Sequence, residues 1–476
     1  MPPQRKPAAK AANKTLKPKA APAPGKNNYR VRVRMYRQGL GDCFLLTFPR
    51  QDKPPFNLLI DCGALNRNKA FMTRVVQHIE ESVKNGAGTG RLDLVVATHE
   101  HKDHLSGFNQ AREIFNRMDI GGVWLGWTEN LSIEEAKAIK QAKKTALAKL
   151  QAALASPFGS TRPLEGVRSL LDFSASDDTT GTGRVAEALD YLKLRGKAAS
   201  NLQFLSPGGK PLTLDGVDDV RVYVLGPPRD PTLLKTSAVT EKMKTDDVVY
   251  HLGLTGTEGM EALNAALSSA DAAADDRYQP FAAEHRISRR SKWFRQISSY
   301  IRATYDAPDQ KWRRIDEDWL GAFGQLALDL DNDTNNTSLV LAFEFVKTGE
   351  VLLFVGDSQI GNWESWAKVS FEVPGSGQSV PALDLLKRTV FYKVGHHCSH
   401  NATLKKGGLE LMEDSALVAF IALDKATAKT QGWDMPAEAL YHWLGEKAAH
   451  RVVISDVKET GGLKEPAAGP RSTSTP

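Results

Sequence analysis

The chain has 476 residues, of which 62 are basic and 56 acidic, giving a formal net charge of +6 at pH 7. This length is enough for one large domain or two ordinary ones with a sizeable core. No apolar run approaches the roughly 18 residues that a membrane helix needs, and the N-terminus has no secretory apolar segment, so a soluble protein is expected. Three cysteines do not form a disulfide-like array, which favours a reducing, cytoplasmic location.

Both ends of the chain are expected to be disordered. Residues 1–26 contain seven basic residues and no acidic one, and are otherwise mostly alanine and proline, so 1–28 is predicted to be a disordered basic arm. The arm either adds non-specific attraction to nucleic acid or serves as a solubilising leader or linker. The segment 457–476, which ends in a stretch rich in Pro, Gly, Ser and Thr, is predicted to be a disordered tail.

The clearest chemical signal follows an apolar run at 92–97. This run is rich in apolar and β-branched residues and predicts a buried strand. Directly after it come His99, His101, Asp103 and His104. Ligands commonly lie on loops at the carboxyl ends of strands, and imidazole with carboxylate suits zinc, manganese or iron. A metal site is therefore predicted here, the alternative being a solvated polar loop.

Two helical segments are predicted further along the chain. A capping-box pattern at 132–135 opens a helix expected to run through Leu154. Its lysines are expected to form a solvated face rather than a binding patch, at positions 137, 140, 143, 144 and 149.

The second helical segment, 285–302, combines aromatic and basic residues. Four large side chains recur at helical spacing: Trp293, Ile297, Tyr300 and Ile301. Trp293 and Ile297 are expected to pack on the domain. The role of three neighbouring arginines stays open, because they either face water, bind phosphates and bases at an active site, or contact a partner protein: Arg289, Arg290 and Arg295.

Two later segments repeat the pattern of a strand followed by ligands. The apolar run 351–355 precedes Gly356 and Asp357. The run 391–394 contains Lys393 and is followed by three histidines: His396, His397 and His400.

Taken in order, these motifs resemble the metallo-β-lactamase superfamily of metal-dependent hydrolases, and within it the hydrolase domain of the ComEC competence family and its stand-alone relatives. Four further pieces carry the resemblance: Gly41-Asp42-Cys43, Leu225-Gly226-Pro227-Pro228, Asn335-Asn336-Thr337-Ser338 and Val394-Gly395-His396-His397. The resemblance implies an α/β fold, a four-layered αββα sandwich spanning 29–456. It leaves two helical insertions, at about 109–201 and 229–331.

The resemblance also implies a set of ligands for two divalent ions, zinc or manganese. His99 and His101 would face metal one, Asp103 and His104 would face metal two, and Asp357 would bridge them. The last ligand would be one of two adjacent histidines, His396 or His397. Asp61, after an apolar run, would support the metal loop.

Two positions depart from the family pattern. Where many members have a third histidine for metal one, this chain has Asn335 and Asn336, of which either is a candidate weak ligand, and Asn336 is assigned to the supporting residues with Asp61. Metal one is then loosely held or absent. Cys398 stands where glycine is usual, either as a small buried residue or as a zinc ligand.

The predicted function is that of a metal-dependent phosphodiesterase or nuclease acting on nucleic acid. Two cations would lower the pKa of a bound water, giving hydroxide, and would stabilise the developing charge. Asp103, Asp357 and His400 are predicted to be catalytic, and Lys393 to bind substrate beside the arginines. Two alternatives are a hydrolase of a small ester, lactone or cyclic nucleotide, and a partner-binding component of a bacterial defence system.

Overall fold

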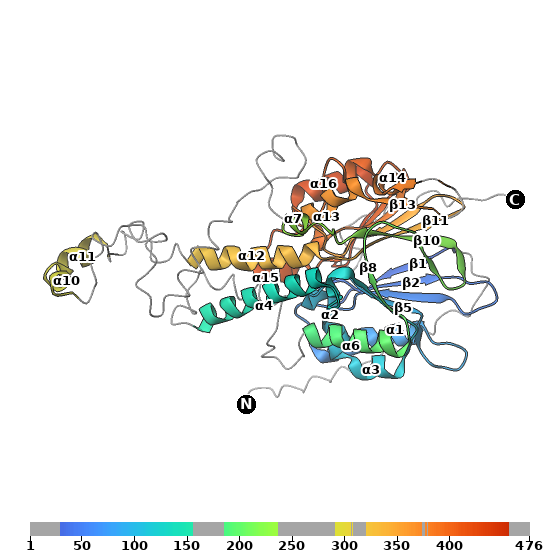
Figure 1. Cartoon of the computed structure of the whole chain (residues 1–476), viewed down its shortest axis with the longest axis horizontal. Coiled ribbons are helices and arrows are strands. Elements are labelled where there is room, and N and C mark those ends of the chain that lie inside the picture. Colours follow the sequence, from blue (N-terminus) through green and yellow to red (C-terminus); the bar gives the residue numbers. More distant parts are fainter. Residues whose placement is uncertain are drawn as a thin grey trace, which may run out of the picture.

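The computed structural model describes residues 29–155, 185–236, 291–305, 307, 320–373, 377 and 379–456 (Figure 1). The predicted arm and tail, and with them Arg289 and Arg290, lie outside the described residues. The described part is a mixed α/β structure with two large sheets. None of its helices is both long enough and apolar enough to cross a membrane.

The first sheet contains six strands in the spatial order β1-β2-β3-β5-β7-β8. Their bounds are Arg32–Met35 (β1), Phe44–Phe48 (β2), Phe56–Ile60 (β3), Leu94–Ala97 (β5), Val123–Gly126 (β7) and Leu202–Leu205 (β8). β1, β2 and β3 pair antiparallel, whereas β3, β5, β7 and β8 are parallel. The buried strand predicted at 92–97 is confirmed as β5.

The second sheet contains seven strands in the order β17-β16-β15-β12-β11-β10-β9. Their bounds are Leu212–Leu214 (β9), Val217–Gly226 (β10), Val340–Phe345 (β11), Val351–Phe354 (β12), Thr389–Lys393 (β15), Val418–Ile421 (β16) and Val452–Ile454 (β17). β12, β15, β16 and β17 are parallel. Two small ladders join Arg91–Leu92 (β4) to Asp119–Ile120 (β6) and Ser370–Glu372 (β13) to Ser379–Pro381 (β14).

An apolar layer joins the facing sides of the two sheets. Phe44 and Leu46 of β2 share one buried cluster with Phe343 and Phe354 of the second sheet, and the rings of Phe44 and Phe354 are 5.7 Å apart. Leu45, between them in sequence, belongs to a different cluster on the opposite face. This alternation is the period of two that a strand requires when both of its faces are buried.

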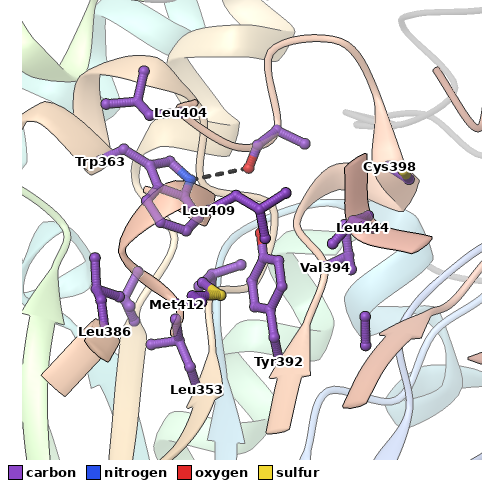
Figure 2. Close-up of a cluster of buried hydrophobic side chains, with 14 of the residues drawn as sticks. Leu353, Trp363, Leu386, Tyr392, Val394, Cys398, Leu404, Leu409, Met412 and Leu444 are labelled. Atoms are coloured by element: carbon purple, nitrogen blue, oxygen red, sulfur yellow. Dashed lines mark hydrogen bonds between the residues drawn. The ribbon is translucent and has the colours of Figure 1, made fainter. Parts of the chain in front are cut away.

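Helices cover the outer face of each sheet. The first sheet packs against Lys69–Ser82 (α1), Lys102–Gln110 (α2), Arg112–Arg117 (α3) and Val185–Ala198 (α6). The second packs against Ile360–Ser365 (α13), Ala382–Lys387 (α14), Lys425–Gln431 (α15) and Glu438–Lys447 (α16). Figure 2 shows part of this second cluster, in which the Trp363 indole N–H donates to the Ala402 carbonyl at 2.9 Å.

The remaining described helices are shorter or lie outside these layers. They are Glu134–Ala155 (α4), Pro231–Leu234 (α7), Lys292–Gln296 (α10), Ser298–Thr304 (α11) and Leu320–Asn336 (α12), with 3-10 turns at Trp127–Glu129 (η1), Trp366–Lys368 (η5), His396–Cys398 (η6) and Leu409–Leu411 (η7). α4 and α12 lie side by side and extend beyond the sheets (Figure 1).

The first predicted insertion, 109–201, contains parts of the sheet layers. β7 lies between β5 and β8 in the first sheet, and α3 and α6 cover that sheet. α4, the helix predicted at 132–154, belongs to this segment and extends beyond the layers.

The lysines of α4 do not all face solvent, contrary to the expectation from sequence. Lys140 and Lys143 pair with Glu100 at 2.8 and 3.1 Å, and Lys140 also pairs with Glu129 at 3.3 Å. Glu100 is 8% exposed and stands between His99 and His101 in sequence. A buried carboxylate needs positive partners, and α4 supplies them to Glu100 in the loop that carries His99 and His101.

The aromatic side chains of α10 and α11 are exposed rather than packed on the domain. Trp293 is 51% and Tyr300 63% exposed, and the two helices lie apart from the sheets (Figure 1). The expected packing of Trp293 is therefore absent from this structure. Helices of five and seven residues present too little apolar surface to bury such rings between themselves.

Candidate metal centre

Four strands carry the candidate ligands at their carboxyl ends. β3 is followed by Asp61 and its parallel neighbour β5 by His99. β12 is followed by Asp357 and its parallel neighbour β15 by the histidine pair at 396–397. The carboxyl ends of parallel strands meet at one edge of a sheet, and here an edge of each sheet contributes to one site.

Four buried side chains converge there, each offering one ligand atom within 4.8 Å of every other: Asp103, His104, Asp357 and His397. Nε2 of His397 lies 2.9 Å from Oδ2 of Asp103, and Nε2 of His104 lies 3.1 Å from Oδ2 of Asp357. The other two nitrogen–oxygen pairs are each 3.5 Å apart. We call these residues the four-residue cluster.

The two imidazoles of the cluster are fixed through their far nitrogens. Nδ1 of His104 donates to Oδ2 of Asp61 at 2.8 Å, and Asp61 also accepts from the Thr98 amide and hydroxyl at 2.8 and 2.7 Å. Nδ1 of His397 donates to the Ala422 carbonyl at 2.6 Å. Each ring therefore turns Nε2 toward the cluster, the nitrogen through which it would bind a metal ion.

Asp357 is held through one of its two carboxylate oxygens. Oδ1 accepts from Nζ of Lys393 and from the His396 amide, both at 3.1 Å, which leaves Oδ2 facing the cluster. Lys393 also pairs with Asp42 and donates to the Gly356 carbonyl at 2.7 Å. It is 1% exposed, so the structure places it beneath the site rather than where a substrate would contact it.

Negative charge is in excess around the cluster. Four buried carboxylates surround His104: Asp42, Asp61, Asp103 and Asp357. Burial alone would lower the pKa of His104, but these carboxylates raise it well above the ordinary histidine value, and the pKa of His397 is also raised. The cluster therefore requires positive charge, which protons or a bound cation would provide.

An orphaned polar atom supports a cation at this place. Oδ1 of Asp103 is buried and has no hydrogen-bond partner in the structure. Leaving a buried charged oxygen unpaired costs free energy, whereas a cation would satisfy it. The donor set, two imidazole nitrogens and two carboxylates, fits zinc and manganese.

Two glycines let neighbouring loops approach the backbone of Asp103 and His104 closely. The Asp42 amide donates to the Asp103 carbonyl at 3.0 Å, and the Cys62 amide donates to the His104 carbonyl at 2.8 Å. A Cβ at Gly41 would lie 2.3 Å from the Asp103 carbonyl oxygen, and one at Gly63 would lie 2.4 Å from its carbon. Only glycine fits such close contacts between backbones.

His99 and His101 form a second buried pair beside the cluster. Nε2 of His99 lies 3.0 Å from Nδ1 of His101. Burial lowers the pKa of both rings, that of His101 to about 3, so both are neutral near pH 7. Neutral imidazoles are the form that binds metal ions.

The two asparagines predicted as weak ligands have different surroundings. Oδ1 of Asn336 accepts from the Gln359 and Asn362 amides, each at 3.2 Å, and its Nδ2 donates to the Thr236 carbonyl at 2.9 Å. Asn336 therefore ties neighbouring loops together and offers no spare oxygen. Oδ1 of Asn335, by contrast, is buried without a partner.

One residue near the pair formed by His99 and His101 was not predicted from the sequence. Asp331 of α12 is 6% exposed, and its Oδ1 lies 3.7 Å from Nε2 of His101. Burial, followed by the charges of Asp103 and Asp357, raises its pKa to about 8. In the sequence, Asp331 stands four residues before Asn335, which would place both on one face of a helix. However, Asp331 lies inside the insertion predicted at 229–331, so it is not among the predicted site residues.

Of the two adjacent histidines, His397 joins the cluster and His396 does not. Nδ1 of His396 lies 2.8 Å from the Ser399 hydroxyl and 3.2 Å from Nε2 of Gln359. The φ angles of 39°, 51° and 68° at 396–398 are left-handed, and the two imidazole rings are 6.0 Å apart. His400, predicted to be catalytic, is exposed.

Cys398 belongs to the apolar core and not to the site. Its side chain is fully buried in the cluster against the second sheet (Figure 2). Burial raises the pKa of its thiol, which disfavours the thiolate that zinc binds. The three cysteines, Cys43, Cys62 and Cys398, are buried free thiols.

Comparison of the chain with protein-family models, with curated proteins and with solved structures finds no match. The chemistry of the His/Asp site and the surfaces around it are therefore the grounds for a function.

Proposed function

We propose that this chain is a metal-dependent hydrolase with the metallo-β-lactamase fold and that it cuts phosphodiester bonds in nucleic acid. The observation that carries the proposal is the four-residue cluster, in which two Nε2 atoms and two carboxylates converge in a buried, negatively charged place. Two facing sheets with helices on both outer faces support the four-layered αββα arrangement.

Asp103, His104, Asp357 and His397 would hold a divalent cation, zinc or manganese. Such a cation, when bound, lowers the pKa of water and stabilises negative charge on a phosphoryl group. Asp61 and the Ala422 carbonyl orient the two imidazoles, and Lys393 directs one oxygen of Asp357 to the cluster. These supports hold the ligands in place before a cation arrives, so little reorganisation is needed on binding.

The surface of α10 and α11 supports a polymeric substrate. Residues 291–305 contain no acidic side chain, and Lys292, Arg295 and Arg302 are exposed beside Trp293 and Tyr300. Basic groups that contact phosphates, together with aromatic rings that stack on bases, are typical of single-strand binding. Because these helices lie apart from the sheets in Figure 1, a substrate that contacts both them and the cluster has to be long.

The assay for this function measures cleavage of end-labelled single-stranded DNA and RNA by the full chain loaded separately with zinc and manganese. We expect metal-dependent cleavage by the wild type and none above background for Asp103→Ala, which removes a ligand oxygen. Asp215→Ala, at a side chain 79% exposed, is the matched control and should cleave like the wild type.

Failure of the metal-loaded wild type to cut DNA, RNA or the small diester bis(p-nitrophenyl) phosphate would contradict the phosphodiesterase proposal. Hydrolysis of a small ester or lactone by the same sample, lost in Asp103→Ala, would instead indicate the alternative substrate class.

A further inference from the structure

The helix α12 places a carboxylate next to the buried pair formed by His99 and His101. Oδ1 of Asp331 lies 3.7 Å from Nε2 of His101, and both side chains are buried. Among the residues that the structure describes, no lysine or arginine nitrogen lies within 4.0 Å of the Asp331 carboxylate. A buried carboxylate without such a partner is costly in its charged form, so a proton donor on the site side would stabilise it.

A neighbouring amide fixes the orientation of this carboxylate. Nδ2 of Asn335, one helical turn further along α12, donates to Oδ2 of Asp331 at 3.1 Å and lies 3.4 Å from Nε2 of His396. Residues four apart share one face of a helix. With Oδ2 occupied by the amide, Oδ1 is the oxygen that faces His101.

The two imidazoles of the pair present different nitrogens to each other. Nε2 of His99 and Nδ1 of His101 are 3.0 Å apart, and neither ring belongs to the four-residue cluster. When one nitrogen of a histidine binds a cation, its proton resides on the other nitrogen, which then needs an acceptor. For His101 that other nitrogen is Nε2, the one beside Asp331.

We propose that Asp331 is a positioning residue: it accepts the Nε2 proton of His101 and so holds Nδ1 of His101 toward the second divalent cation, the one that the resemblance assigns to His99 and His101. Asp331 would do for His101 what Asp61 does for His104, but from a helix of the predicted insertion instead of from a sheet strand. This inference rests on the proposed function, because a second cation has a role only beside an occupied four-residue cluster.

The experiment titrates Zn²⁺, and separately Mn²⁺, into the metal-free full chain and measures the number of sites and their Kd values by calorimetry and by competition with a chromophoric chelator. The wild type should bind two equivalents. Asp331→Leu should weaken one of them by about 10- to 100-fold, the usual effect of losing a support of a metal ligand, and leave the other unchanged. Asp331→Asn, which keeps an acceptor oxygen, should weaken it less.

The matched control is Asp333→Leu, two residues along the same helix, where the acidic group is not beside the histidine pair. It should bind both equivalents like the wild type. Circular dichroism and urea unfolding establish that each variant is folded. If Asp331→Leu does not fold, Asp331→Asn carries the test.

The remaining outcomes are distinguishable. Two equivalents bound with wild-type Kd values by Asp331→Leu would overturn the role of Asp331 and leave the proposed function in place. A wild type that binds a single equivalent would overturn the second site alone. A wild type that binds neither Zn²⁺ nor Mn²⁺ would overturn the proposed function itself.

Discussion

Replacing His397 with alanine should abolish tight binding of a cation at the four-residue cluster. Nε2 of His397 lies 2.9 Å from Asp103 and 3.5 Å from Asp357, so its loss removes one of the converging ligand atoms. Removing a mere support of a ligand costs about 10- to 100-fold in affinity, and removing a ligand should cost at least as much as the upper figure. Competition with a chromophoric chelator measures the Kd.

The adjacent histidine provides the control for this change. His396 contacts Ser399 and Gln359 instead of the cluster, so His396→Ala should keep the affinity of the cluster within a few fold of the wild type. Equal losses in the two variants, or a larger loss in His396→Ala, would contradict the assignment of His397 as the ligand.

Lys393→Met should destabilise the metal-free protein by about 3–5 kcal/mol, the usual cost of removing one member of a buried ion pair. The change leaves Asp42 and Asp357 buried without the amine that pairs with both. Urea unfolding in the presence of a chelator measures the free energy of unfolding. Chelation matters because a cation bound to Asp357 would replace part of the lost positive charge.

Two further variants separate charge from packing. Lys347→Met, at a side chain 80% exposed, should change the free energy of unfolding by less than about 0.5 kcal/mol. Adding Asp42→Asn to Lys393→Met removes one of the stranded charges and should restore part of the lost stability, which a double-mutant cycle would measure as coupling. A loss below about 1 kcal/mol in Lys393→Met would contradict the buried pairing.

The candidate ligands could be predicted from the sequence because a local pattern marks each of them. The apolar runs before His99, Asp357 and His396 predict strands, and ligands at strand ends meet at a sheet edge. The pairing of Lys393 with Asp42 has no local signal, since Asp42 lies in the loop between β1 and β2 of the first sheet and Lys393 ends β15 of the second. A lysine at the end of a strand is more often exposed than buried, so its role as a substrate contact was the natural expectation.

Other features depend on backbone angles and on long-range packing. The choice between His396 and His397 follows from left-handed φ angles, which the residue types do not indicate. β7 is a four-residue strand with no candidate ligand after it. Because no motif marks it, the sequence predicts that it belongs to the insertion at 109–201. Asp331 and His101 are far apart in the chain, and only the long-range packing of α12 near the loop before α2 brings them together.

X-ray diffraction from crystals grown with Mn²⁺, with data collected for the anomalous signal of manganese, tests the central claim most directly. The account predicts an anomalous peak within ligand distance of Asp103, His104, Asp357 and His397. Absence of a peak among these four side chains at saturating Mn²⁺, and again at saturating Zn²⁺ with data at the zinc edge, would contradict it.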